Sequence, residues 1–193
     1  MSGFPILETE RLILRPAHAR LTPQVTAFYR KNAAWLQQFE PTHEPGFTRE
    51  AYQRRLLRED AARAHKGESL RYWFAAKDDP KTTIGCVVLD HISFGALQSC
   101  VIAYKLDRDA QHQGYATEAV SYMTDIAFSV LKLHRVEALI MPRNGPSLAL
   151  ARRCGFSEEG LAKQYLRING VWEDHIRMVR LAPENREEDN AEL

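Results

Sequence analysis

Hydrophobic positions follow two different periods along this chain, and the two periods predict a protein that mixes strands with helices. Short runs rich in β-branched and aromatic residues predict strands at residues 12–16, 71–76, 83–89, 98–107, 136–141, 160–168 and 171–181. Polar stretches with helix-start signals predict helices at 22–32, 48–66 and 146–154. In the first of these, Thr22 is expected as the N-cap before Pro23 at the first helical position.

A fourth helix is predicted at 116–131, where apolar residues recur three and four positions apart and mark one buried face. Those residues are Ala116, Ala119, Val120, Met123, Ala127, Val130 and Leu131.

Turn-forming residues between the runs indicate how the strands connect. A polar turn at 78–81 and a short turn at 94–96 separate three strands, which suggests an antiparallel meander. Asn169-Gly170, between the last two runs, is a strong hairpin signal. The chain shows no internal repeat and no linker, so residues 1–182 are expected to form one domain. Residues 183–193 are polar and acidic and are expected to be disordered.

Composition and charge narrow the class of protein. The 193 residues are 45% hydrophobic and 26% charged, which suits one globular domain with a sizeable core. A formal net charge of +1 gives no electrostatic reason to expect nucleic acid or an anionic membrane as a partner. No apolar run approaches the ~20 residues of a membrane-spanning helix. The first residues show no basic stretch followed by an apolar one, so no signal peptide is expected.

The cysteines and histidines argue against a disulfide framework and against a metal site. Cys86, Cys100 and Cys154 are odd in number, widely spaced and set in apolar runs. Buried thiols in a reducing cytosol explain them best, so we expect a cytoplasmic protein. The seven histidines make no His-x-x-x-His spacing, and no Cys-x-x-Cys occurs, so no metal is expected.

Residues 111–117 lie between a predicted strand and a predicted helix and are the most informative segment. Backbone N–H groups at a helix start, together with the positive dipole end, form an anion site. Gly114 permits a tight turn and a close approach of a ligand to the backbone. The chain has neither the Gly-x-x-x-x-Gly-Lys loop of nucleoside triphosphate sites nor an early Gly-x-Gly-x-x-Gly for a dinucleotide.

The pattern Gln111-x-x-Gly114-x-Ala116 resembles the pyrophosphate loop of the GNAT acetyltransferases, and the order of predicted elements is similar to the GNAT order over nearly the whole chain. Further segments look like the RimJ/RimL branch, more RimJ than RimL: residues 10–15, 36–41, 144–160 and 166–175. The resemblance implies a GNAT fold of the α/β (α+β) class. Its mixed, mostly antiparallel sheet would have about six to seven strands, flanking helices and a splay at the acetyl-CoA site.

The resemblance also implies acetyl-CoA as the donor and an amine as the acceptor, which in this branch is the N-terminus of a ribosomal protein. Backbone N–H groups near the strand end would hold the pantetheine arm and polarise the thioester carbonyl. The loop amides would hold the pyrophosphate, and the start of the helix at 146–154 would meet the CoA arm, although its Asn and Ser also suit a simple helix cap. The implied CoA-binding residues are Lys105, Leu106, Gln111, His112, Gln113, Gly114, Tyr115, Ala116, Thr117, Asn144 and Ser147.

The amine must lose a proton before it attacks the thioester. An α-amino group has a pKa near ~7.8 and a lysine near ~10.4, so an N-terminal acceptor needs far less help from a base. Glu40, in the loop after the first helix, is one candidate base. Asp174 is the second, because it shares an apolar strand face with Trp172, although it could equally be a structural partner of an Arg or a backbone amide. Asp90 and His91 could also line the acceptor pocket.

A hydroxyl group is expected to assist the departing thiolate. Many GNAT enzymes use a tyrosine four residues before the Gly-Phe pair, but this chain has Ala151 there. Ser147 aligns with the serine that RimL-like enzymes are thought to use, and Tyr115 and Tyr165 are weaker candidates.

Three functions therefore remain open. The favoured one is an acetyl-CoA-dependent N-acetyltransferase that acts on a protein N-terminus by direct attack in a ternary complex. The second acts on a small-molecule amine, such as a polyamine, an aminoglycoside or an aminoacyl-nucleotide. The third, suggested by Ala151, is a CoA-binding module without catalysis. The oligomeric state, monomer or homodimer, stays open as well.

Overall fold

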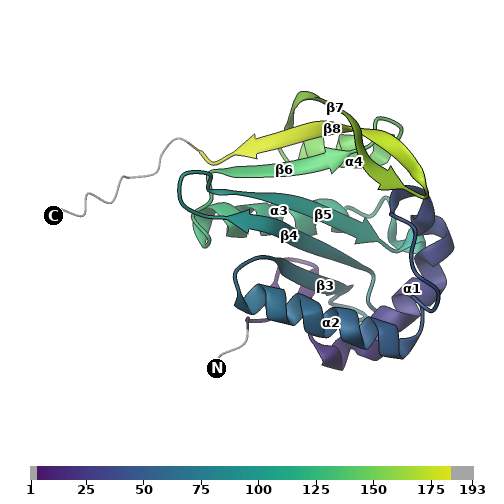
Figure 1. Cartoon of the computed structure of the whole chain (residues 1–193). Helices are drawn as coiled ribbons and strands as arrows, with labels where there is room; N and C mark the ends of the chain where they lie inside the picture. Colours follow the sequence, from purple (N-terminus) through teal and green to yellow (C-terminus); the bar gives the residue numbers. More distant parts are fainter. Residues whose placement is uncertain (1–3, 184–193) are drawn as a thin grey trace.

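The computed structural model describes residues 4–183, and within them eight strands form a single sheet in the order β1-β2-β3-β4-β5-β6-β8-β7 (Figure 1). All neighbouring strands are antiparallel except β5 and β6, which are parallel. The strands are β1 (Leu7–Glu8), β2 (Leu12–Pro16), β3 (Leu70–Ala76), β4 (Gly85–Ser93), β5 (Ser99–Leu106), β6 (Arg135–Ile140), β7 (Ser157–Ile168) and β8 (Val171–Leu181).

Helices cover both faces of this sheet. The α-helices are α1 (Thr22–Leu36), α2 (Glu50–His65), α3 (Tyr115–Ser129) and α4 (Gly145–Arg153). In Figure 1, α1 and α2 lie in front of the sheet and α3 lies behind it. Three short 3₁₀ turns in the described part of the chain complete the elements: η1 (Ala19–Leu21), η2 (Gln37–Phe39) and η3 (Arg108–Ala110).

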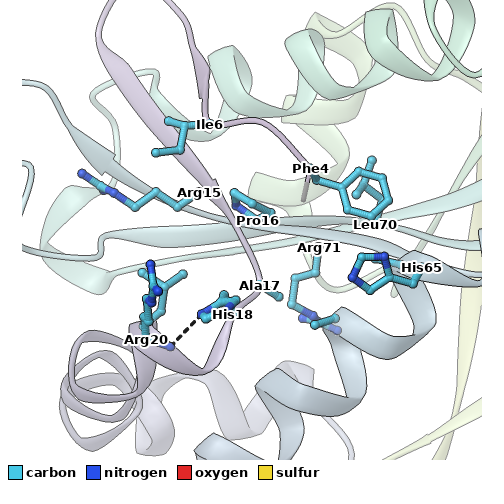
Figure 2. A pocket seen from close by; sticks show the side chains of 13 residues that line it. Phe4, Ile6, Arg15, Pro16, Ala17, His18, Arg20, His65, Leu70 and Arg71 are labelled. Atoms are coloured by element: carbon cyan, nitrogen blue, oxygen red, sulfur yellow. Dashed lines mark hydrogen bonds between the residues drawn. The ribbon is translucent and has the colours of Figure 1, made fainter. Parts of the chain in front are cut away.

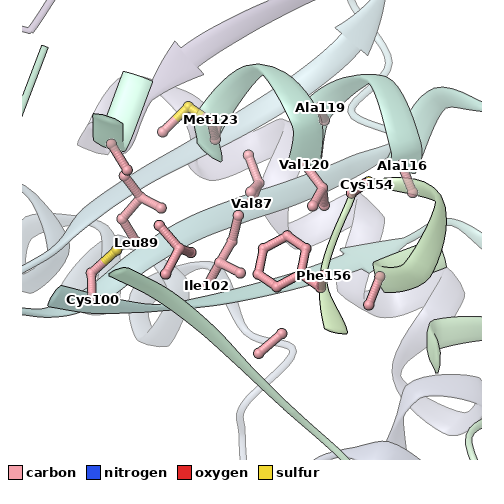
Figure 3. Packing of buried hydrophobic residues seen from close by; sticks show 14 of the residues in the cluster. Val87, Leu89, Cys100, Ile102, Ala116, Ala119, Val120, Met123, Cys154 and Phe156 are labelled. Carbon is pink, nitrogen blue, oxygen red and sulfur yellow. The ribbon is translucent and has the colours of Figure 1, made fainter. Parts of the chain in front are cut away.

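Each face of the sheet has its own apolar core. Between the sheet and α3, residues such as Val87, Ile102 and Met123 are buried, and Figure 3 shows Val87 and Ile102 beneath the helix that carries Met123. On the other face, Phe28 of α1 and Trp73 of β3 pack with their ring centroids 5.5 Å apart. Alternate residues of one strand thus enter different cores, which fixes the register of the sheet.

The predicted fold class is confirmed, and the differences are local. Every strand predicted from the periods is present, but β1 is too short to have left a periodic signal. Helix α1 runs to Leu36, and Thr22 is its first residue, with Leu21 as the N-cap. Val130 is the C-cap of α3 and is exposed, so placing it on the buried face was wrong. The predicted disordered tail, from residue 184 on, lies outside the described residues.

Candidate active site

Strands β5 and β6 start side by side and then separate. The register pairs only Ser99, Cys100 and Val101 of β5 with β6. On its other side, β5 stays paired with β4 as far as Leu106. Among the described residues, the last part of β5 therefore has one edge without a neighbouring strand, and a cavity of about 490 Å³ opens beside it.

The alternation of backbone donors along β5 decides which N–H groups face this gap. Asp107, just after the strand, donates its N–H to the carbonyl oxygen of Ile84 at 2.7 Å, on the β4 side. Lys105 lies two residues earlier, and its N–H points to the same side because donors alternate with a period of two. The N–H groups of Tyr104 and Leu106 consequently face the gap. Of the two predicted amide donors, Leu106 is at the open edge, whereas Lys105 reaches the cavity through its side chain.

The loop before α3 presents further unpaired backbone donors to the same cavity. Helix α3 begins at Tyr115, and Glu118 donates an early intrahelical hydrogen bond to the carbonyl oxygen of Gly114 at 3.0 Å. The N–H groups of Tyr115, Ala116 and Thr117 precede it and have no acceptor within the helix. The positive end of the helix dipole lies at the same place, so this loop can bind a phosphate group.

The shape of the loop depends on its glycine and on an arginine from β1–β2. His112 has a φ of 60° and Gly114 a φ of 82°, both left-handed. A Cβ at Gly114 would lie 3.1 Å from Nη2 of Arg11, so both conformation and space favour glycine there. Nη1 of Arg11 donates to the carbonyl oxygen of Gln113 at 2.8 Å, and the same guanidinium pairs with Glu118. The turn before β2 thus holds the loop in place.

Helix α4 forms another wall of the cavity and carries two predicted site residues. Asn144 is its N-cap, with Oδ1 accepting a hydrogen bond from the Ser147 N–H at 3.3 Å. Oγ of Ser147 lies 2.7 Å from the hydroxyl oxygen of Tyr104 on β5. The cap interpretation of Asn144 is therefore confirmed, and the Ser147 hydroxyl is tied to the neighbouring strand.

Glu40 and Lys105 form a buried ion pair at the cavity. Oε2 of Glu40 also lies 2.7 Å from Nε2 of His43, and Nζ of Lys105 donates to the hydroxyl of Tyr29 at 3.0 Å. The side chains of Glu40 and Lys105 are only 11% and 19% exposed. Both charges are therefore largely removed from water and depend on each other.

The electrostatics of this pair follow from its burial and its contacts. Burial alone would raise the pKa of Glu40, but the charge and hydrogen bond of Lys105, together with His43, hold this pKa below its usual value. Burial also opposes the charge on Lys105, yet its neighbours Tyr29 and Glu40 keep the pKa of the ammonium above its usual value. Each partner favours the charged form of the other. Glu40 is thus an ion-paired carboxylate, which makes it a weak proton acceptor.

Most of the predicted site residues come together at this one cavity. Those that line it are Glu40, Lys105, Leu106, Gln111, His112, Gly114, Ala116, Thr117, Asn144 and Ser147. Gln113 and Tyr115 lie in the same loop, where the guanidinium carbon of Arg11 sits 4.9 Å from the centroid of the Tyr115 ring. Apolar side chains from the end of α1 and from η2 complete the wall: Trp35, Leu36 and Phe39.

Other predicted residues are not among those that line the cavity. Oδ1 of Asp174, on β8, accepts a hydrogen bond from the Gln164 N–H at 2.7 Å. Asp174 is thus a partner of a backbone amide, which was the alternative to a role as base. Tyr165 of β7 is 43% exposed. Asp90 pairs with Arg63 of α2, Oδ1 to Nη2 at 2.5 Å, and the adjacent His91 is exposed. A base role for Asp174 remains a prediction.

Comparison with known proteins shows the family of this chain. Residues 11–157 match the family model described as an acetyltransferase (GNAT) domain. The chain belongs to the GNAT acetyltransferase family. A relative named "Probable N-acetyltransferase YjcK", from Bacillus subtilis, is 35% identical over 94% of this chain and 100% of its own length. The [ribosomal protein uS5]-alanine N-acetyltransferase of Escherichia coli is 30% identical over 92% of this chain and 91% of its own length.

A solved structure shares the fold as well. Mycobacterium smegmatis RimJ in complex with CoA-disulfide superposes with a TM-score of 0.84 at 28% identity, covering 89% of this chain and 82% of its own. The GNAT fold expected from the loop and from the order of elements is therefore confirmed for this chain.

A second cavity, of about 330 Å³, lies between the start of the chain, β2 and α2, and shares no lining residue with the first (Figure 2). Its walls include Phe4, Pro16 and Leu70, with the basic residues Arg15 and Arg20 at one side. None of the lining residues within positions 4–183 carries a carboxylate.

The part of the chain that the structure describes contains neither a candidate metal site nor a candidate membrane-spanning helix. In residues 4–183, no three His, Cys, Asp or Glu side chains are grouped so that they could hold a metal ion. No helix of that range has the length and apolar character needed to cross a membrane. Cys86, Cys100 and Cys154 are free and buried, as the sequence predicts.

Sequence reasoning missed two residues of this site, Tyr104 and Arg11, and it missed the ion pair that the side chain of Lys105 forms with Glu40. The side chain of Tyr104 contacts Ser147, and the side chain of Lys105 pairs with Glu40. A period of two along β5 was the available signal, because it sends neighbouring side chains to opposite faces of the sheet. The role of Arg11 was hidden because its partners, Gln113 and Glu118, lie more than a hundred positions away in the sequence.

Proposed function

We propose that this chain transfers an acetyl group from acetyl-CoA to the N-terminal α-amine of a protein, with a ribosomal protein as the favoured acceptor. The amine attacks the thioester directly while both substrates are bound. The family supports acetyl transfer as the reaction. The chemistry of the cavity supports the choice of donor and acceptor.

The donor fits the gap between β5 and β6. The loop at residues 111–117 offers N–H donors to a pyrophosphate, and the open edge of β5 offers the N–H groups of Tyr104 and Leu106 to an extended arm. Asn144 and Ser147 lie on the facing wall. The similar Mycobacterium smegmatis RimJ was solved with CoA-disulfide, which supports the same kind of ligand here.

The state of Glu40 is the observation that favours an α-amine over a polyamine. Among the described residues that line the cavity, Glu40 carries the only carboxylate. That carboxylate is already paired with Lys105 and is hydrogen-bonded to His43. A polyamine that carries several charges would need free acidic groups, whereas a peptide N-terminus brings one amine followed by uncharged backbone. The uS5-alanine N-acetyltransferase of Escherichia coli, 30% identical, supports the same class of acceptor.

Such an acceptor also needs little proton chemistry from the protein. With a pKa near ~7.8, roughly one α-amine in ten is neutral at pH 7, so water can carry the remaining proton away. The neutral nitrogen attacks the carbonyl carbon, and the β5 amides that face the gap stabilise the charge that develops on the carbonyl oxygen. The carbon–sulfur bond then breaks, and the sulfur leaves with the electron pair. The amide product and the CoA thiol remain.

A matched set of acceptors tests the proposal. One peptide has a free N-terminal Ala or Ser and one internal lysine. Its partner has the same sequence with the N-terminus acetylated. Spermidine and an aminoglycoside form the third arm, and release of CoA thiol is measured with each. We expect release with the free N-terminus alone.

Each other result has a clear meaning. Release with the blocked peptide would mean that lysine is the acceptor. Release with spermidine or the aminoglycoside alone would move the function to a small-molecule amine. CoA binding without thiol release from any acceptor would favour a binding module.

The three free, buried thiols fit a reducing compartment, so we place this activity in the cytoplasm.

A further inference from the structure

Tyr104 of β5 lies close to the part of helix α4 where many GNAT enzymes have a tyrosine and this chain has Ala151. Ala151, at the position where many GNAT enzymes have a tyrosine, is 1% exposed. Ser147 lies one turn earlier on the same face of α4, because residues four apart are neighbours on a helix surface. Tyr104 packs against the apolar cluster that includes Ala151. Its hydroxyl oxygen lies 2.7 Å from Oγ of Ser147.

The two hydroxyl groups are placed for a directed hydrogen bond. Tyr104 and Ser147 both line the cavity beside the open edge of β5. The Tyr104 hydroxyl has one hydrogen, which can go to Oγ of Ser147 or to the Ser147 carbonyl oxygen at 3.1 Å. When the phenol donates to Oγ, the serine hydrogen is free to point into the cavity. Burial raises the pKa of Tyr104 to about 12, so the phenol keeps its hydrogen at neutral pH.

We propose that Tyr104 is a positioning residue that holds the Ser147 hydroxyl so that its hydrogen points at the departing sulfur of the acyl donor. Ser147 is the catalytic residue of the pair, and Tyr104 acts through it. The inference rests on the proposed use of acetyl-CoA but does not depend on which amine is the acceptor. It also explains how the site works with alanine at position 151.

The step conserves atoms and charge. The amine nitrogen forms a bond to the carbonyl carbon and loses one proton to water. The carbon–sulfur bond breaks, and the sulfur leaves with the electron pair as a thiolate, which accepts the hydrogen bond from Ser147. The thiolate then takes up a proton from water, since a free thiol has a pKa near ~8.5. Tyr104 and Ser147 end the cycle as they began it.

A double-mutant cycle with Tyr104→Phe and Ser147→Ala tests this arrangement. Removing the serine hydroxyl should lower kcat about a hundredfold, the usual effect of losing one such donor. Tyr104→Phe keeps the ring and should lower kcat roughly tenfold, with KM for acetyl-CoA unchanged within about twofold. The double variant should be no slower than Ser147→Ala alone, because Tyr104 has nothing to position once the hydroxyl is gone.

Tyr72→Phe is the matched control. The Tyr72 hydroxyl on β3 is largely buried and donates to the carbonyl oxygen of Pro5 at 3.1 Å, away from the cavity. Its loss should lower stability as Tyr104→Phe does while leaving kcat unchanged. Rate losses that multiply in the double variant would overturn the inference, as would a Tyr104→Phe effect confined to KM.

The test of Tyr104 and the test of the proposed acceptor give separate answers. The leaving sulfur is the same whichever nucleophile attacks. The cycle can therefore be run with any amine that releases thiol, or on the slow hydrolysis of acetyl-CoA by water. If the wild-type protein does not acetylate the peptide, the proposed acceptor is rejected. Only the pattern across the cycle decides the role of Tyr104.

Discussion

Arg11 and Glu118 are joined by two hydrogen bonds although 107 positions separate them in the sequence. The backbone N–H of Arg11 donates to Oε1 of Glu118 at 2.8 Å, and Nε donates to Oε2 at 2.7 Å. The same guanidinium donates to the carbonyl oxygen of Gln113. The start of β2 is thereby tied to the loop that precedes α3 and to the first turn of that helix.

Replacing Arg11 should therefore weaken the binding of the pyrophosphate without changing the chemistry. We expect Arg11→Ala to raise KM for acetyl-CoA about tenfold, with kcat reduced less than threefold, because a loosened loop loses oriented N–H donors. Acetyl-pantetheine lacks the pyrophosphate and is the internal comparison. With that donor, the variant and the wild type should have equal kcat/KM. An equal loss with both donors would show that Arg11 supports the fold in general.

Gly114 can be tested in the same assay with a control elsewhere in the chain. Gly114→Ala places a Cβ at a φ of 82° and 3.1 Å from Nη2 of Arg11. Gly95→Ala meets a similar backbone conformation, φ 68°, and its Cβ would have no other atom of the described residues within 4 Å. Both should cost about 1–2 kcal/mol of stability from the left-handed conformation. Only Gly114→Ala should also raise KM for acetyl-CoA, and an equal rise in both variants would contradict the role of the loop.

Breaking the Glu40–Lys105 ion pair should lower the free energy of unfolding strongly, and a second substitution should restore most of it. Glu40→Gln leaves the buried ammonium of Lys105 without its partner and should cost about 3–5 kcal/mol in urea unfolding. Adding Lys105→Met removes the stranded charge and should recover most of that loss. Arg55→Gln is the control, because its pair with Glu59 is half exposed and screened by solvent, so its loss should leave stability nearly unchanged. A double variant as unstable as Glu40→Gln alone would contradict this account.

Lowering the pH should remove the contribution of the Glu40–Lys105 ion pair to the free energy of unfolding. The pKa of Glu40 in the folded protein is lowered, so the unfolded state, with a pKa near ~4.3, takes up protons first as the pH falls. The stabilisation is complete above pH ~5 and declines as the pH falls through the lowered folded pKa. Urea unfolding between pH 3 and pH 7 should show a shallower decline for Glu40→Gln/Lys105→Met than for the wild type. Equal slopes would mean that other carboxylates dominate.

Local patterns in the sequence were sufficient for the fold and for the backbone part of the site. The period of α3, the Asn169-Gly170 turn and the loop around Gly114 are each encoded within a few residues, so their structures follow from short-range physics. The side-chain contacts are different. The pairing of Glu40 with Lys105, and of Tyr104 with Ser147, depends on how β5 packs between α1 and α4. The period of two along β5 indicates which face of the sheet each side chain takes, but it does not indicate which residues meet that side chain there.

The dependence of the rate on pH tests the nature of the acceptor independently of any mutation. If a neutral α-amine attacks and Glu40 remains ion-paired, kcat/KM for a peptide should rise tenfold per pH unit below ~7.8 and then level off. The same curve is expected for Glu40→Gln/Lys105→Met, since neither side chain would carry the transferred proton. An acceptor lysine would instead make the rate rise towards pH ~10. A rate that is already flat well below pH 7 in the wild type, and that loses this plateau in the double variant, would identify Glu40 as the base after all.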